Sequence, residues 1–265
     1  MIKLIACDMD GTLLDSRKRL PQGFSDVLRR LRQRGVAFAV ASGRQYAALR
    51  RDMEEFAGDI FFICENGALV MERDKQVFID PMPVDTLADA VTAAQGLEGV
   101  YPVLCRAGVA LVQKDGSESF YAATKPYYPS LQMVDNLLDF CDSPDVCKVA
   151  YYDEGDAQTH EMPALSERLD GCLSVILSGA NWVDVMKTGT NKGVAMLGLQ
   201  KELGILPEEC MAFGDYLNDC ELLSSVGESY AMANAHPQLK AMAKHIAPSN
   251  DEDGVLRVIR ERVLL

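Results

Sequence analysis

The segment Leu4-Ile5-Ala6-Cys7-Asp8-Met9-Asp10-Gly11-Thr12-Leu13-Leu14 joins a short apolar run to two closely spaced carboxylates. Residues Lys3 to Cys7 have the composition of a buried β-strand. Successive side chains of a strand point to opposite sides, so Asp8 and Asp10 are expected on one side. A plain Asp-Gly turn after a strand is the simpler interpretation. However, two like charges about 4 Å apart repel by roughly 4 kcal/mol at an effective dielectric near 20, and a divalent cation would offset that repulsion.

Short apolar runs alternate with helical patterns after this segment. Strands are predicted at Val36 to Ala41 and Ile60 to Cys64, and helices at 24–34 and 45–56. Near-continuous apolar strands separated by helices indicate an α/β fold with a parallel sheet that helices cover on both faces. Right-handed crossovers then place the carboxyl ends of the strands along one edge, which is where such sheets bind ligands.

The pattern changes after Cys64 and returns near Trp182. A predicted hairpin at 68–71 and 76–79 leads to Pro81-Met82-Pro83, which favours an extended linker. The next hundred residues are expected to hold helices at 84–95, 130–141 and 157–169, and strands at 100–105, 108–113, 146–152 and 172–178. The later part alternates again, with strands to Met186, at 210–213 and at 229–232, and helices at 191–203, 220–226, 236–243 and from Glu252. We therefore predict a discontinuous core at 1–81 and 184–265, with an inserted α+β domain at 82–183.

The composition limits the partners. The 265 residues include 26 Lys and Arg against 39 Asp and Glu, which gives a formal net charge of −13. This charge repels phosphate backbones and anionic lipid, so we expect neither a nucleic acid nor a membrane as partner. The segment 82–183 holds 5 of the basic and 15 of the acidic side chains. A solvated outer face explains this excess more simply than the exclusion of polyanionic substrates.

Cysteine usage and the N-terminal residues favour a cytoplasmic location. The eight cysteines form no CxxC pair, and most are flanked by apolar residues. Buried, reduced thiols explain them better than disulfides or a zinc site. The first apolar stretch reaches Asp8 too soon for a signal peptide, and no run approaches the roughly 18 apolar residues of a membrane span.

Three more polar groups stand at predicted strand ends or helix starts. Ser42-Gly43-Arg44 precedes the helix at 45–56, where free backbone N–H groups can bind an anion, although Ser42 alone is more simply a helix N-cap. Lys192, within Asn191-Lys192-Gly193, needs an anionic partner at a helix N-terminus, and Lys187 is its rival cation. The segment 214–219, Gly-Asp-Tyr-Leu-Asn-Asp, adds two carboxylates and an amide. Together these groups predict a phosphate pocket, where oxygen ligands favour Mg²⁺.

These motifs resemble those of the haloacid-dehalogenase-like superfamily, and more narrowly of its Cof-type phosphatases, which carry a large α/β cap. The resemblance rests on DMDGTLL at 8–14, SGR at 42–44, ENGA at 65–68, NKG at 191–193, GDYLND at 214–219 and SNDEDGV at 249–255. It implies a Rossmann-like core with the insertion as the cap. It also implies a Mg²⁺-dependent phosphatase for small phosphorylated metabolites, with sugar phosphates as the expected class.

The resemblance also implies a role for each site residue. Asp8 is expected to be the nucleophile that forms an aspartyl-phosphate, and Asp10 to protonate the leaving alcohol and later deprotonate water. Mg²⁺ is expected on the Asp8 carboxylate, the Asp10 main-chain carbonyl and Asp215, while Asp219 orients Lys192 or a metal-bound water. The groups expected to hold the phosphoryl oxygens are the Met9 amide, Ser42, Gly43, Lys192 and Asn218, and those expected to reach the rest of the substrate are Arg44 and Asn66. Phosphoryl transfer depends mainly on such positioning and charge neutralisation.

Two departures from the family pattern and two other functions stay open. Tyr216-Leu217 stand where the family more often has a small residue first, which leaves the volume of the pocket open. Ser42 replaces the commoner Thr but keeps the hydroxyl. A phosphomutase would use the same motifs and return the phosphate to a sugar. A non-catalytic phosphate or metal sensor would need a lost catalytic group, whereas all the charged motif residues are present.

Overall fold

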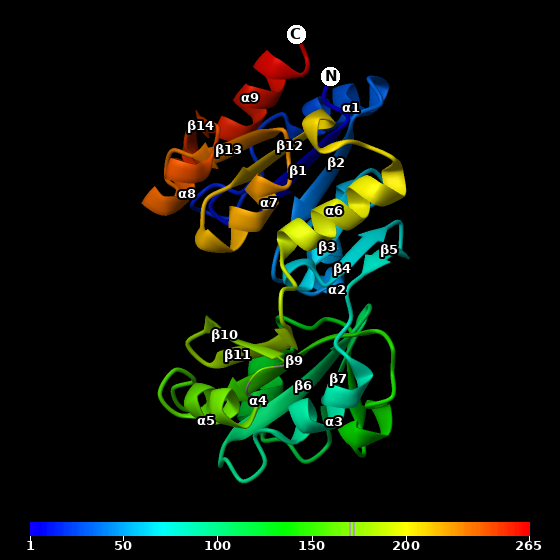
Figure 1. Cartoon of the computed structure of the whole chain (residues 1–265), viewed down its shortest axis with the longest axis vertical. Coiled ribbons are helices and arrows are strands. Elements are labelled where there is room, and N and C mark those ends of the chain that lie inside the picture. The colour runs from blue at the N-terminus through cyan, green and yellow to red at the C-terminus, as the bar shows by residue number, and fades with distance from the viewer. Residues whose placement is uncertain (170, 172) are drawn as a thin grey trace. The chain divides into compact units, whose positions relative to one another are not determined.

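The computed structural model describes residues 1–169, 171 and 173–265, and these form two compact units (Figure 1). The core unit comprises Met1–Gly43, Asp52–Phe78 and Asn191–Leu265. The cap unit comprises Arg44–Arg51 and Ile79–Thr190. Residues 184–190 were expected in the core but group with the cap unit, as does the short segment that begins at Arg44.

An eight-stranded sheet forms the centre of the core unit, in the order β14-β13-β12-β1-β2-β3-β4-β5. Neighbouring strands are parallel from β14 to β3, and β4 runs antiparallel to β3. The strands are β1 Leu4–Asp8, β2 Ala37–Ala41, β3 Phe61–Cys64, β4 Leu69–Glu72, β5 Lys75–Ile79, β12 Cys210–Gly214, β13 Glu228–Met232 and β14 His245–Ala247. Every residue of β1 is buried, as its unbroken apolar run requires between two parallel neighbours.

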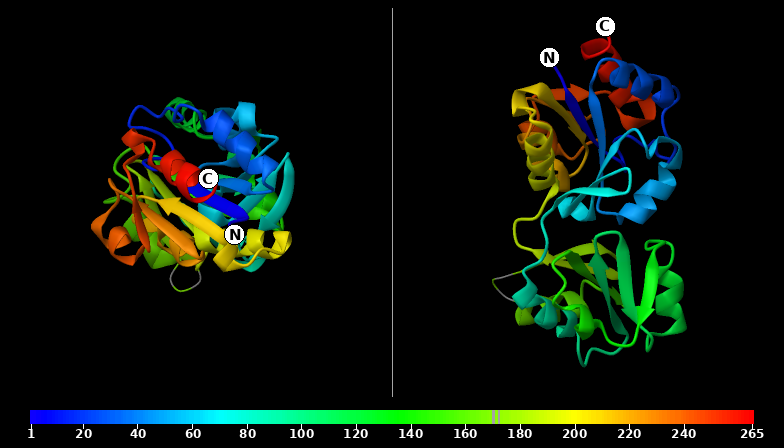
Figure 2. Two further views of the ribbon diagram at one scale, coloured as in Figure 1. Left: turned by 90° about the horizontal axis from the view of Figure 1, so that it is seen from above. Right: turned by 90° about the vertical axis from the view of Figure 1, so that its right-hand side faces the viewer.

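Helices cover both faces of this sheet. Helix α1 packs beside α9, and α6 packs beside α7, and Figure 2 shows the two pairs on opposite sides of the sheet. The amphipathic period of α1 buries Phe24, Val27, Leu28 and Leu31. The helices that follow the core strands are α1 Phe24–Gln33, α2 Tyr46–Asp52, α6 Lys192–Leu203, α7 Cys220–Ser224, α8 Pro237–Met242 and α9 Gly254–Arg262.

The strand order brings distant parts of the chain to one edge of the core sheet. Strand β1 lies between β2 and β12, with Asp8 beside Ala41 and Cys7 beside Phe213. The residues after Ala41 and Phe213 begin the two polar motifs at 42–44 and 214–219. The predicted convergence at the carboxyl edge is therefore present in the backbone.

The cap unit is built on a six-stranded sheet in the order β10-β11-β9-β6-β7-β8. Neighbouring strands are antiparallel except β7 and β8, which are parallel. Along β9, Val149 and Tyr151 enter one buried cluster and Ala150 enters another, so both faces of the sheet are covered. The cap elements are α3 Val84–Thr92, β6 Val100–Arg106, β7 Val109–Gln113, α4 Glu118–Thr124, β8 Leu131–Val134, β9 Val146–Asp153, α5 Glu161–Arg168, β10 Leu173–Gly179 and β11 Trp182–Lys187.

Several elements differ from those predicted. The helix expected at 130–141 is wrong, because β8 pairs with β7 and a 3-10 helix follows at Leu137–Phe140. Strand β11, expected in the core, pairs with β9 and β10 in the cap sheet. The sequence analysis missed α4 and β14. Of the strand expected at 172–178, residue Cys172 lies outside the described residues.

Two general expectations can be compared with the described chain. The seven cysteines that the structure describes form no disulfide. In the same ranges of residues, no helix is both long and apolar enough to cross a membrane.

Candidate active site

Lys192 lies at the centre of a cluster of carboxylates at the edge of the core sheet. Its Nζ donates to Asp8 Oδ1 and to Asp219 Oδ1, both at 2.6 Å. The Lys192 side chain is 1% exposed and that of Asp219 is fully buried. The three residues come from the end of β1, the start of α6 and the loop after β12. The fold therefore brings together residues that are up to 211 positions apart in the chain.

Asp215 completes the cluster. Carboxylate oxygens of Asp8, Asp215 and Asp219 lie within 4.8 Å of one another. Thr12 Oγ1 donates to Asp215 Oδ1 at 3.1 Å. Gly11 has a φ of +83°, and a Cβ there would collide with Asp215 Oδ2. The glycine after Asp10 is thus required both by its left-handed backbone and by the closeness of Asp215.

Asp219 differs from the other two carboxylates because both of its oxygens already accept hydrogen bonds. Oδ1 accepts from Lys192, and Oδ2 accepts from the backbone N–H groups of Asp215 at 3.1 Å and Tyr216 at 3.3 Å. These bonds hold the loop at 215–219 and orient Lys192. Asp8 has the opposite character, because its Oδ2 is buried and has no hydrogen-bond partner in the protein.

The electrostatics of the cluster follow from its burial and its excess of negative charge. Burial raises the pKa of Asp8 to about 7, although Lys192 acts to lower it. Burial, followed by repulsion from Asp219, also raises the pKa of Asp215. For Lys192, burial lowers the pKa, but attraction to Asp8 and Asp219 outweighs it, so the pKa is raised. One lysine among three carboxylates leaves a net negative site, which fits a bound cation.

The SGR and ENGA motifs meet in the same unit. The backbone N–H of Asn66 donates to the carbonyl of Ser42 at 3.2 Å. A Cβ on Gly43 would lie 2.6 Å from Asn66 Oδ1, so a larger side chain at 43 would displace Asn66. Ser42 is buried, and it directly follows the strand beside Asp8. Arg44, the last residue of the SGR motif, belongs to the cap unit.

The other predicted site residues occupy the loops after β1 and β12. Met9 is buried, and its carbonyl accepts a hydrogen bond from the Leu14 N–H at 2.9 Å. Asn218 is exposed within the loop that Asp219 holds. Tyr216 is 58% exposed. Its ring packs edge-on against His236 with the ring centroids 5.7 Å apart.

The shared orientation expected of Asp8 and Asp10 is wrong in its premise. Strand β1 ends at Asp8, so strand alternation does not extend to Asp10. The Asp10 Oδ1 lies instead 2.6 Å from Lys18 Nζ, and the two side chains are 37% and 63% exposed. Asp10 is therefore partly exposed, and its role as acid and base stays a prediction.

Three residues near the site escaped the sequence analysis. Thr12 holds Asp215, as described above. Asn234 Nδ2 donates to the Gly11 carbonyl at 2.8 Å, and Asn250 Nδ2 donates to the Leu14 carbonyl at 2.9 Å. Asn250 lies in the SNDEDGV motif at 249–255, to which the sequence analysis gave no role in the site. Asparagines in loops after two neighbouring strands were the available signal, because such loops reach the same edge.

Comparisons with known proteins agree with this geometry. A family model described as haloacid dehalogenase-like hydrolase matches residues 5–259. The chain is 34% identical over 259 residues to the 5-amino-6-(5-phospho-D-ribitylamino)uracil phosphatase YbjI of Escherichia coli K12, covering 97% of this chain and 95% of that protein. It is 31% identical over 257 residues to the HMP-PP phosphatase of Klebsiella pneumoniae, covering 95% and 91%. The crystal structure of SMU.1108c from Streptococcus mutans matches with a TM-score of 0.79 at 29% identity, covering 100% of both chains.

Proposed function

The chain is a phosphatase of the haloacid dehalogenase-like hydrolase family, and we propose that it hydrolyses small phosphorylated metabolites by way of a phosphorylated Asp8. One observation carries this proposal. Lys192 holds one oxygen of the Asp8 carboxylate at 2.6 Å, while the other oxygen is buried and has no partner in the protein. A fixed carboxylate with one uncommitted oxygen suits a nucleophile.

The steps at Asp8 follow from this arrangement. Asp8 Oδ2 forms a bond to phosphorus while the bond to the leaving oxygen breaks, and Asp10 gives that oxygen a proton. Asp10 then removes a proton from water, which attacks the phosphorus, frees phosphate and restores the Asp8 carboxylate. Lys192 stays ionised throughout, because its pKa is raised, and it offsets charge on the phosphoryl oxygens.

The residues of the cluster fit a hard divalent cation, and we propose Mg²⁺. The donor set is all oxygen, and Asp8 and Asp215 each offer a carboxylate at a net negative site. Asp219 is better placed to orient Lys192, because both its oxygens are already used. A bound Mg²⁺ would supply charge stabilisation for the phosphoryl group. The Asp10 carbonyl as a further ligand stays a prediction.

We propose that the backbone and side chains at Met9, Ser42, Gly43 and Asn218 hold the phosphoryl oxygens, and that Arg44 and Asn66 reach the rest of the substrate. The relatives named above act on phosphorylated small molecules, which supports that class for this chain. Sugar phosphates within that class, and a cytoplasmic location, stay predictions from the sequence.

The test replaces the proposed nucleophile and removes the proposed metal. We expect Asp8→Asn to lower the turnover of p-nitrophenyl phosphate by roughly 10⁴-fold or more, because the amide cannot accept the phosphoryl group. Asp26→Asn, at an exposed carboxylate on α1, is the matched control and keeps the wild-type rate. Removal of divalent ions with EDTA abolishes wild-type turnover, and added Mg²⁺ restores it.

Three outcomes would contradict parts of the proposal. Turnover by a folded Asp8→Asn variant, checked by circular dichroism, would remove the nucleophile assignment. Full activity in EDTA would remove the metal. Formation of an isomeric sugar phosphate without release of inorganic phosphate would indicate the phosphomutase.

A further inference from the structure

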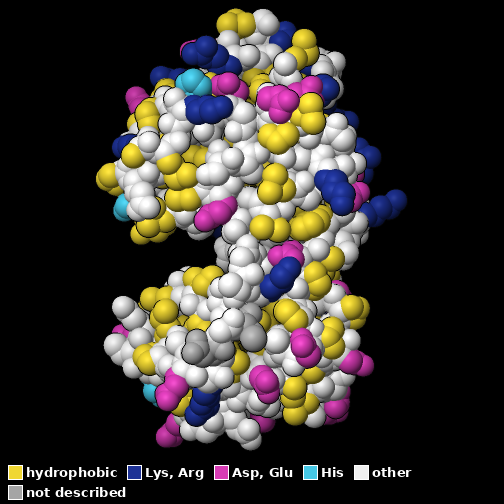
Figure 3. Space-filling model, in the orientation of Figure 1, with side chains coloured by type: hydrophobic (Ala, Val, Ile, Leu, Met, Phe, Trp, Pro, Cys, Tyr) yellow, Lys and Arg dark blue, Asp and Glu magenta, His cyan; other side chains and the backbone are white. Residues whose placement is uncertain are grey.

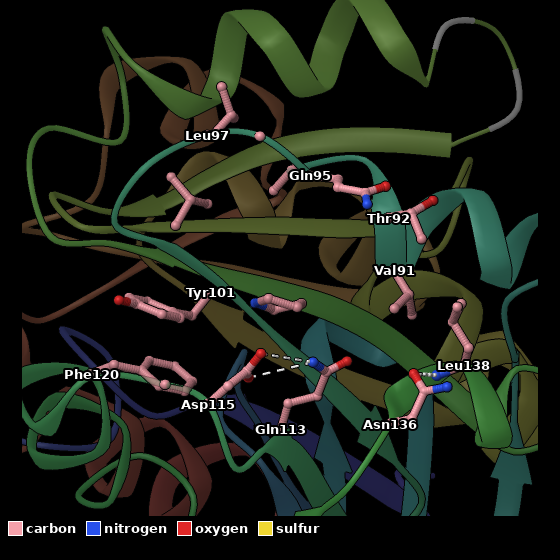
Figure 4. A pocket seen from close by; sticks show the side chains of 15 residues that line it. Val91, Thr92, Gln95, Leu97, Tyr101, Gln113, Asp115, Phe120, Asn136 and Leu138 are labelled. Atoms are coloured by element: carbon pink, nitrogen blue, oxygen red, sulfur yellow. Dashed lines mark hydrogen bonds between the residues drawn. The ribbon is translucent and has the colours of Figure 1, made fainter.

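A cavity of about 390 Å³ lies wholly within the cap unit (Figure 4). It is bounded by the end of α3 and the loop after it, the start of β6, the end of β7, α4 and the segment before the 3-10 helix at 137–140. Its volume is in the usual range for small-molecule sites, about 300–1,000 Å³. None of the residues assigned above to phosphate, metal or nucleophile lines it.

The walls of the cavity combine apolar side chains, two of them aromatic, with polar ones. Figure 4 shows Tyr101 and Phe120 at one end and Val91 and Leu138 at the other. The rings of Tyr101 and Phe120 stack with centroids 4.8 Å apart and an interplanar angle of 19°. Phe120 is 1% exposed, so the aromatic wall is anchored in the core of the cap unit. Such a wall suits an apolar body and also attracts a cation.

The charged side chain that lines the cavity is negative. Among the fifteen lining residues that the structure describes, Asp115 is acidic and none is Lys, Arg or His. The neighbouring Lys114 pairs elsewhere, with Asp135 Oδ1 at 2.6 Å. Asp115 is exposed at the rim of the cavity, and Gln113 Nε2 lies 3.4 Å from both of its oxygens, which is long for an N–H···O bond. The carboxylate is therefore free to accept from a ligand, in competition with water.

Acidic side chains elsewhere on the cap unit add to the negative charge near the cavity. Figure 3 shows many Asp and Glu side chains and few Lys or Arg on the visible face of the cap unit. An anion such as a phosphorylated metabolite would meet a negative potential at this cavity with no basic side chain to offset it. The cavity therefore does not suit the substrate class of the proposed phosphatase reaction.

We propose that this cavity binds a small organic ammonium ion, with its charged head on Asp115 and its apolar body against Tyr101, which Phe120 supports from behind. The Gln113 and Asn136 amides add no acceptor for the head, because Gln113 Oε1 accepts from the Leu137 N–H and Asn136 Oδ1 accepts from the Leu138 N–H. The preference for an amine therefore rests on the Asp115 carboxylate. This binding site is separate from the carboxylate cluster of the core unit and does not depend on the proposed reaction.

The test compares three probes of similar shape and different charge, with the full chain in a calorimeter: phenethylamine, 2-phenylethanol and phenylacetate. We expect phenethylamine to bind about tenfold more tightly than 2-phenylethanol, because of the charge-assisted bond to Asp115, and phenylacetate to bind most weakly. Asp115→Asn should remove the advantage of the amine and leave the alcohol unchanged. Tyr101→Leu should weaken both the amine and the alcohol.

The controls separate this site from the rest of the molecule. Asp142→Asn changes an exposed carboxylate of the same unit that does not line the cavity, and it should leave all three affinities unchanged. Asp8→Asn should also bind phenethylamine as the wild type does, whether or not it retains phosphatase activity. Equal affinities for the amine and phenylacetate, an Asp115→Asn variant that keeps the preference for the amine, or no binding of phenethylamine at 10 mM would each overturn the proposal.

Discussion

The core unit and the cap unit each bury a lysine against a carboxylate, and the two pairs differ in their surroundings. Lys192 contacts both Asp8 and Asp219 at 2.6 Å, and Asp215 lies in the same cluster. In the cap sheet, Lys148 Nζ lies 3.1 Å from Asp184 Oδ2, and the two side chains are 5% and 4% exposed. The two pairs differ in that Lys192 contacts two carboxylates, one of which is the proposed nucleophile, whereas Lys148 contacts Asp184. If the proposed site is right, replacing the two lysines should have different consequences.

Of the two buried lysines, Lys192 is expected to have the larger effect on turnover. Lys192→Met removes the group that fixes Asp8 and offsets phosphoryl charge, so we expect the kcat for p-nitrophenyl phosphate to fall by about 10²–10³-fold. Lys192→Arg keeps the charge but not the compact geometry, and it should restore only part of the rate. A rate within threefold of the wild type in a folded Lys192→Met variant would remove the distinction between the two lysines.

At Lys148 we expect a loss of stability and little change in turnover. Lys148→Met leaves Asp184 buried without this partner, so we expect the free energy of unfolding to drop by about 3 kcal/mol, measured by urea denaturation. The kcat per folded molecule should stay within about twofold. The double variant Lys148→Met with Asp184→Leu should recover much of the lost stability, because it removes the uncompensated charge. A fall in kcat like that of Lys192→Met would place Lys148 in the catalytic machinery.

The smallest effect is expected at Glu161, a carboxyl in the cap unit that is fully buried. Burial, followed by repulsion from Asp153, raises its pKa from 4.5 to about 8. Between these two values the folded state binds a proton that the unfolded state has released. The proton bound to folded Glu161 therefore stabilises the protein fully below pH 4.5. This stabilisation is lost as the pH rises from 4.5 through 8.

The measurement for Glu161 is the slope of Tm against pH. From pH 5 to pH 8.5 we expect the Tm of the wild type to fall by several degrees more than that of Glu161→Gln, which has no carboxyl to titrate. Glu167→Gln, at an exposed position of the same helix, is the control and should keep the wild-type slope. Parallel curves for the wild type and Glu161→Gln would show that Glu161 does not titrate in this range.

Local patterns predicted the core well because its strands are short apolar runs that bury both faces. The run at 3–7 corresponds to β1 at Leu4–Asp8, and the run at 210–213 corresponds to β12. Patterns failed where tertiary pairing decides. Residues 131–138 place apolar side chains at a helical period, yet pairing with β7 makes 131–134 a strand. The cap sheet is also largely antiparallel, so some of its strands, such as β6 and β7, follow one another with no helix between them.

The candidate site was predictable where it depends on strand ends and not where it depends on loop conformation. Asp8 and Asp215 were expected to meet because motifs that follow neighbouring parallel strands share an edge. Lys192 meets them at the start of α6, although the strand before it, β11, belongs to the cap sheet. The turn after β1 directs Asp10 toward Lys18, and it directs Thr12 toward Asp215. Neither direction follows from residue spacing, because each is set by hydrogen bonds between segments distant in the chain.

The position of β1 between β2 and β12 has a consequence for synthesis on the ribosome. While the polypeptide still ends before Cys210, the central strand has one neighbour and its other edge is open to mispairing. The inserted cap lengthens that interval by more than a hundred residues. The nascent chain can therefore hydrolyse substrate only late in its synthesis. A truncated product that lacks the final third contains Asp8 but not Lys192.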